Sequence, residues 1–189
     1  MKQSFLFCTC FLVAFQSFGQ KFEALDKSPM DMVYFPDNFS HDRKFDPKKI
    51  GDLPAIIRVI YSRPAKKDRV IFGKVVPYNK VWRTEANEAT EIKFYQDVTM
   101  GGKTVPAGTY TLFTIPNTTE WTIIINKDLD HWGDYSYNEA NDVLRVKVPV
   151  KKSNKTIENF SMKFEMGKER EAIMAMAWED TLVEVPISF

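Results

Sequence analysis

Short segments with apolar side chains at every second position recur from residue 55 to the end of the chain. The clearest is 160–166, in which Phe160, Met162 and Phe164 alternate with polar residues. A period of two places the apolar side chains on one face of a β-strand, and short strands separated by turn residues are typical of antiparallel sheets. Similar segments lie at 92–98, 109–115, 121–125, 144–150, 172–178 and 182–187. The sequence therefore predicts an all-β fold, with one helical turn near 138–142.

The turn residues indicate how these strands connect. Met100-Gly101-Gly102-Lys103 predicts a tight hairpin, because both glycines can adopt positive φ. Glu179-Asp180 predicts a second hairpin, between the last two segments. Segment 55–62 is apolar on both faces and is expected to be a central strand. We expect an antiparallel β-sandwich, jelly-roll or Greek-key-like, rather than a β-barrel, because a barrel with a ligand lumen needs polar inward rows.

The first nineteen residues have the order of an export signal. Lys2 is followed by an apolar run over 5–15, and the small residues Ser17 and Gly19 precede Gln20. The run is shorter than the roughly 20 residues that a membrane helix needs. We therefore predict a signal peptide at 1–19, an irregular arm at 20–54 with a short edge strand near 31–35, and one β-sandwich domain at 55–189. The mature protein is expected in the periplasm or outside the cell, with no transmembrane segment.

Cysteine and charge exclude several kinds of site. Cys8 and Cys10 both lie in the predicted signal, so the mature chain would have no disulfide and no thiolate metal site. Lys2 is the one charged residue of that signal, and the remaining chain carries 25 charges of each sign. A nucleic-acid partner is not expected, because phosphate-binding surfaces carry a basic excess. The acidic loop 126–137 lacks the glycine and closing glutamate of a calcium loop, so we predict no metal and no cofactor. No sequence feature indicates an oligomer.

The segment 81–90 concentrates the chemistry of the chain between two strand-like regions. Trp82 offers an apolar face, Arg83 a planar fork of donors, Asn87 both a donor and an acceptor, and Glu88 an acceptor. Its polarity favours a surface position. Arg63 ends the preceding strand and is expected to approach this segment. These five residues are the predicted binding site for a small polar molecule or glycan, or for a partner in the cell envelope.

Two other interpretations of the same residues stay open. Arg83 and Glu88 could form an internal ion pair, with Asn87 in a turn and Trp82 in the core. Alternatively, Glu85, Glu88 and Glu91 could supply the paired carboxylates of a carbohydrate-active hydrolase of the envelope. Serine-type catalysis is not expected, because neither His41 nor His131 stands beside a nucleophile turn.

Several motifs make the chain resemble the DUF2911 family, exported bacterial domains of unknown function. The resemblance extends from about residue 28 to the C-terminus, and it implies no particular reaction. The family usually has glycine where this chain has Glu85, so a glycine that serves positive φ or close approach to a ligand would be lost here. The matching motifs are Ser28-Pro29, Tyr61-Ser62-Arg63-Pro64, Ile71-Phe72-Gly73, Val76-Pro77-Tyr78, Val81-Trp82-Arg83, Ala86-Asn87-Glu88-Ala89-Thr90, Pro106-Ala107-Gly108-Thr109-Tyr110, Trp121-Thr122 and Ala177-Trp178-Glu179-Asp180.

Overall fold

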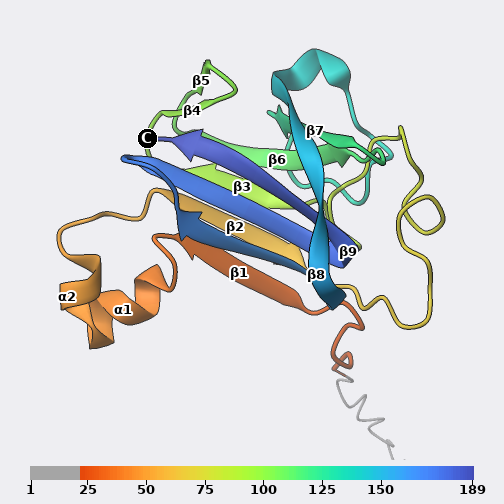
Figure 1. The fold of residues 1–189 in the computed structure, drawn as a ribbon, viewed down its shortest axis with the longest axis horizontal. Helices are drawn as coiled ribbons and strands as arrows, with labels where there is room; N and C mark the ends of the chain where they lie inside the picture. The colour runs from red at the N-terminus through yellow and green to blue at the C-terminus, as the bar shows by residue number, and fades with distance from the viewer. Residues whose placement is uncertain (1–21) are drawn as a thin grey trace, which may run out of the picture.

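A computed structural model describes residues 22–189, which form two layers of antiparallel strands (Figure 1). The predicted signal peptide at 1–19 lies outside the described residues. The strands follow the order β1-β2-β3-β6-β7-β8-β9-β4-β5 in one sheet that stays open rather than closing into a barrel. The all-β fold predicted from the alternation is confirmed.

The first layer contains β1 to β3, β6, β7 and the first part of β8. Strands that follow one another in sequence are neighbours in this layer, as in a meander, except between β3 and β6. The hairpin β4–β5 comes between these two strands in sequence and instead pairs with β9 at the edge of the second layer. β2 is paired on both sides, as its two apolar faces predict. The strands of this layer are β1 (Met30–Phe35), β2 (Ile57–Ser62), β3 (Glu91–Phe94), β6 (Gly108–Ile115), β7 (Glu120–Asn126) and β8 (Asp142–Met166).

The long strand β8 passes from one layer to the other. Its first part pairs with β7 and its last part with β9, with register shifts between Lys152, Ile157 and Ser161 where the direction changes. Figure 1 shows the last part of β8, together with β9, in front of β2, β3 and β6. The second layer is completed by β9 (Glu171–Ser188), β4 (Val98–Met100) and β5 (Lys103–Val105). A bent β8 therefore makes one sheet into a sandwich.

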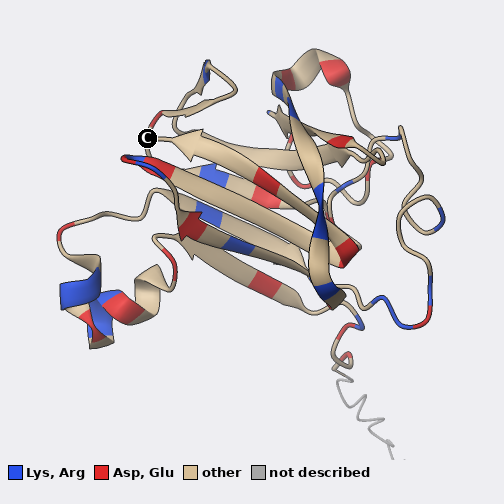
Figure 2. Ribbon diagram, viewed as in Figure 1, with Lys and Arg blue, Asp and Glu red and all other residues tan. Residues whose placement is uncertain are grey.

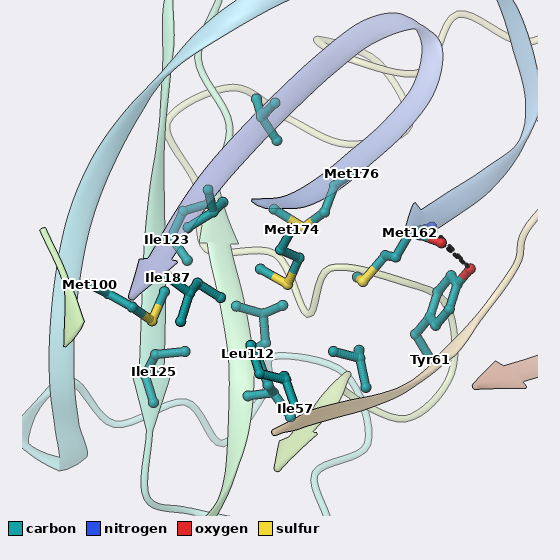
Figure 3. Close-up of a cluster of buried hydrophobic side chains, with 14 of the residues drawn as sticks. Ile57, Tyr61, Met100, Leu112, Ile123, Ile125, Met162, Met174, Met176 and Ile187 are labelled. Carbon is teal, nitrogen blue, oxygen red and sulfur yellow. Dashed lines mark hydrogen bonds between the residues drawn. The ribbon is translucent and has the colours of Figure 1, made fainter. Parts of the chain in front are cut away.

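β9 turns back on itself at the predicted hairpin. Fully extended, its residues would span roughly 60 Å at about 3.3 Å each, yet the backbone N–H of Phe189 donates to the carbonyl of Arg170 at 2.9 Å. Glu179 has φ 58 at the turn, and the ribbon in Figure 3 makes the turn visible. The predicted glycine hairpin is also present, between β4 and β5, with φ 56 at Gly101 and 76 at Gly102.

The core lies between the two layers and is built from the alternating apolar side chains. Figure 3 shows methionines of β8 and β9 facing Leu112 of β6 and isoleucines of β7 and β2. One polar contact crosses this interior, because the N–H of Met162 donates to the hydroxyl of Tyr61 at 2.9 Å. Both groups are buried, so each satisfies a hydrogen-bonding need of the other.

The arm before β2 is more regular than predicted. β1 is the expected edge strand, but two short helices follow it, α1 (Phe39–Phe45) and α2 (Pro47–Ile50). Asp42 of α1 is buried and accepts from His41 at 2.8 Å and from Lys49. The expected helical turn near 138–142 is η1 (Glu139–Asn141). Within 22–189, no helix is long and apolar enough to cross a membrane.

Charged residues of both signs are interspersed along the strands and loops of this fold (Figure 2). Ion pairs join neighbouring strands, for example Arg58 of β2 with Glu91 of β3 at 2.9 Å. Exposed or half-exposed pairs of this kind each stabilise a protein by about 0 to 1 kcal/mol. The sandwich therefore depends on its apolar core.

Candidate functional site

The connection between β2 and β3, residues 63–90, covers one end of the sandwich and forms a pocket there. It contains no strand longer than an isolated bridge. The pocket has a volume of about 260 Å³. Its walls combine two indoles, two guanidinium groups and two carboxyl-bearing residues with small apolar residues. The lining residues are Ser28, Pro64, Arg69, Val75, Val76, Pro77, Val81, Trp82, Arg83, Glu85, Ala86, Asp134 and Trp178.

Trp82 is the buried anchor of this connection. Its ring stacks on Trp178 with 6.1 Å between centroids and 18° between planes, and it is 6% exposed. Backbone hydrogen bonds of 2.7 and 2.9 Å pair Trp82 with Thr114 of β6. The indole N–H donates to the carbonyl of Glu85 at 3.1 Å. The residue thus belongs to the aromatic core and also contributes to the pocket wall.

Arg83 follows the anchor and lines the pocket. Its Nε is buried and has no hydrogen-bond partner among residues 22–189. In that part of the chain it forms no ion pair either, so the internal pair with Glu88 is not observed. A buried guanidinium donor is normally paired. Arg83 is therefore a free donor in the wall of a pocket.

Glu85 is buried, although it lies in the most polar segment of the chain. Glu85 is 3% exposed, and its Oε2 accepts a hydrogen bond from the backbone N–H of Ser62. Burial raises the pKa of Glu85 to about 9, and the negative charge of Glu88 adds to this, whereas the Ser62 bond and Arg83 act in the opposite direction. The carboxyl group is consequently neutral at pH 7.

Ser62 holds this segment against the end of β2. Its hydroxyl donates to the carbonyl of Ala86 at 2.7 Å and accepts from the N–H of Ala86 at 3.1 Å. Positive φ occurs at Thr84 (68) and Asn87 (66), whereas Glu85 is not among the residues with positive φ. A residue with a side chain at position 85 is therefore accommodated without backbone strain.

The other three predicted site residues lie outside the pocket. Arg63 is occupied by Asp31 at 3.0 Å, the Ser161 hydroxyl at 2.9 Å and the Phe160 carbonyl at 3.3 Å, so it ties β2 to both layers. Asn87 accepts from the N–H of Gly133 at 2.8 Å through its carbonyl. Glu88 is exposed and bridges to Trp132. Trp82 and Arg83 thus reach the pocket, and Arg63, Asn87 and Glu88 do not line it.

Comparison with known families bears on this arrangement. The family model described as "Protein of unknown function (DUF2911)" matches residues 48–187. The chain belongs to the DUF2911 family. The match contains every pocket residue except Ser28. Comparison with curated proteins and with solved structures found no match. Membership assigns no function, so the function is argued from the pocket.

In this DUF2911 chain, three ionisable residues of the pocket, Arg69, Glu85 and Asp134, were not among the predicted binding residues. Arg69 is exposed, lines the pocket and donates to the carbonyls of Ala65 at 2.6 Å and Lys66 at 3.1 Å. Asp134 comes from the loop before η1, and Glu85 had been considered only as a carboxylate of the hydrolase alternative. No local pattern marks Arg69 or Asp134, because they meet the pocket through tertiary structure alone.

A metal site is not evident in the part of the chain that the structure describes. Within 22–189, no group of three or more histidine, cysteine, aspartate or glutamate side chains is placed to hold an ion. The pocket instead offers neutral and charged hydrogen-bonding groups beside indole surfaces. Such a set suits a small organic molecule with polar substituents.

Proposed function

We propose that this protein binds a small polar ligand in the pocket beside Trp82, Arg83 and Glu85. The observation that carries the proposal is the buried Nε of Arg83, which lacks a partner among the described residues and belongs to a side chain that lines the pocket. Leaving a buried donor unsatisfied costs about 1 to 3 kcal/mol, and more for a charged group. An acceptor oxygen of a ligand would remove this cost, so binding is favoured at this wall.

The size of the pocket limits the ligand. A volume of about 260 Å³ lies below the range of roughly 300 to 1,000 Å³ that is usual for sites of drug-sized molecules. One sugar ring or one molecule of amino-acid size fits this limit. Trp82 and Trp178 supply an apolar wall for the carbon skeleton, while Arg83 and Asp134 bind polar substituents.

The protonation of Glu85 favours an electron-rich ligand. Because the pKa of Glu85 is raised to about 9 by burial, its carboxyl group carries no charge at neutral pH and does not repel an anionic substituent at Arg83. A protonated carboxyl group also offers a donor in addition to its acceptor. The ligand is therefore expected to carry a carboxylate or several hydroxyl oxygens.

Thermal denaturation with a panel of sugars, sugar acids and amino acids tests this proposal. At least one compound should raise the midpoint of wild type, and the rise should disappear in Arg83→Met, which keeps the aliphatic stem but removes the donors. Arg170→Met is the matched control, because Arg170 lies over the ring of Phe189 and away from the pocket. Equal shifts in wild type and Arg83→Met would refute binding at this wall.

A hydrolase acting on envelope carbohydrate is a second candidate. Its two carboxyl groups would be those that line the pocket, rather than the predicted set of Glu85, Glu88 and Glu91. Glu91 is paired with Arg58, and neither Glu88 nor Glu91 lines the pocket. Glu85 and Asp134 both do, and a general acid must be protonated at working pH. Turnover of a glycan that is lost in Glu85→Gln would support this activity, and turnover unchanged in that variant would exclude Glu85 as the acid.

Export completes the proposal. The basic, apolar and small-residue order of 1–19 supports cleavage before Gln20 and a location in the periplasm or outside the cell. Mass spectrometry of the protein recovered from a bacterial host tests this. We expect a mature chain that starts at Gln20. Exported protein that still contains residues 1–19 would contradict this cleavage site.

A further inference from the structure

Two aromatic side chains are exposed in the loop that closes one side of the pocket. Trp132 is 62% exposed and Tyr135 is 85% exposed. The other three tryptophans of the chain, Trp82, Trp121 and Trp178, are buried. Exposed large aromatic side chains remain costly to solvate, and they are frequent at recognition surfaces.

The loop that carries them is held in place. The N–H of Ala89 donates to the carbonyl of His131 at 2.9 Å, and the N–H of Gly133 donates to that of Asn87 at 2.8 Å. Beneath the loop, Phe113 packs edge to face against His131 and Tyr137, with centroids 5.8 and 5.1 Å apart. The two exposed rings therefore project from an anchored backbone.

Gly133 allows one of these rings to lie close to the backbone. It has φ 70, and a Cβ built on it would come within 2.9 Å of two ring carbons of Tyr135. A side chain at position 133 would displace the ring. Tyr135 is thus almost fully exposed and lies close to the backbone of Gly133.

The aromatic loop is continuous with the pocket. Asp134 lies between the two aromatic residues in sequence and forms part of the pocket wall. An extended chain advances at most about 3.6 Å per residue, and Trp132 and Tyr135 lie two residues and one residue from Asp134. On the other side, Glu88 bridges to Trp132 next to the Ala86 wall.

The charges around this loop select the class of ligand. Glu88 and Asp130 are exposed and Asp134 is half-buried, so the surface beside the two rings is acidic and would repel an anionic lipid headgroup. Sugar rings present an apolar C–H face, which packs on an aromatic ring, and hydroxyl donors, which carboxylates accept. Trp132, Tyr135 and these carboxylates match that combination.

We propose that the pocket and the Trp132–Tyr135 loop form one extended site for an oligosaccharide, with one ring in the pocket and the next over the two aromatic side chains. This inference rests on the proposed function, because it uses the same pocket. It adds the class of ligand and a second subsite outside the pocket.

Tryptophan fluorescence tests the second subsite directly, because acrylamide should quench mainly Trp132. The probes are two neutral pairs, N-acetylglucosamine with chitotetraose and glucose with cellotetraose. At least one tetrasaccharide should bind about tenfold more tightly than its monosaccharide and protect Trp132 from quenching. Trp132→Ala and Tyr135→Ala should each remove this gain while monosaccharide affinity stays unchanged.

Phe45→Ala is the matched control, because Phe45 of α1 is an exposed aromatic residue (73%) on another part of the fold. A monosaccharide that binds through Arg83, with no gain for its tetrasaccharide, would overturn the extended site and leave the proposed function intact. Absence of binding by all four saccharides would overturn the inference, while non-sugar ligands of the panel would still test the pocket. Tetrasaccharide binding unchanged in Arg83→Met would overturn both.

Discussion

Replacing Glu85 with glutamine should make the protein more stable at alkaline pH. The side chain is buried, and its pKa is raised from 4.5 to about 9, chiefly by that burial. Glutamine keeps the shape and an acceptor oxygen for the N–H of Ser62, but it cannot ionise. The variant therefore removes the titration and preserves the hydrogen bond.

The sign and size of the effect follow from proton linkage. Below pH 4.5 the carboxyl group is protonated in both folded and unfolded chains, so its contribution to stability is fully present. As pH rises from 4.5 towards 9, the unfolded chain loses the proton and the folded chain retains it, and wild type loses stability. The slope is about 1.36 kcal/mol per pH unit, which amounts to about 4 kcal/mol between pH 5.5 and 8.5.

Urea unfolding followed by tryptophan fluorescence at pH 5.5, 7 and 8.5 measures this difference. The free energy of unfolding of Glu85→Gln minus that of wild type should increase by about 4 kcal/mol across this range. Glu169→Gln, a change at an exposed carboxylate, should run parallel to wild type. A constant difference between Glu85→Gln and wild type would refute the burial of a neutral carboxyl group.

Three further substitutions test how the pocket and core are held. Ser62→Ala removes both hydrogen bonds to Ala86 and should cost about 1 to 3 kcal/mol in urea unfolding; no loss would show that the hydroxyl does not hold the segment. Tyr61→Phe leaves the buried N–H of Met162 without its 2.9 Å acceptor and should cost a similar amount, about 1 to 3 kcal/mol, by calorimetry; a neutral result would indicate that water replaces the hydroxyl. Trp178→Ala empties one side of the aromatic stack and should cost about 3 to 5 kcal/mol by denaturant titration, and a cost below 1 kcal/mol would contradict the packing.

Strand positions could be predicted because a half-buried strand imposes its own period on the sequence. The segment 160–166 falls within β8, and the two-glycine turn closes β4 against β5 with the expected positive φ. The bend of β8 had no such signature, since residues 153–156 are polar and resemble a loop between two strands. Helices α1 and α2 are too short to show a helical period, and prolines beside them suggested an irregular arm.

The pocket could be predicted only in part, because it is assembled from residues between 28 and 178. Trp82 and Arg83 were found through their residue types. Asp134 and Arg69 carry no local signal, and Asn87 and Glu88 share the segment without sharing the pocket. Glu85 was the least predictable, because a glutamate between polar neighbours is usually solvated, and its burial depends on Ser62 and Trp82 contacts made by the folded chain.

Nuclear magnetic resonance of the arginine side chains tests the central proposal most directly. A buried Nε–H of Arg83 should give a resolved, slowly exchanging signal, identified by its absence in Arg83→Met. Titration with the panel of sugars, sugar acids and amino acids should shift this signal in a saturable way for at least one compound, while the signal of Arg63, already bonded to Phe160, stays in place. An Arg83 signal that no compound shifts, or one that exchanges as fast as that of an exposed arginine, would contradict the proposal that a buried, unpaired Arg83 donor binds the ligand.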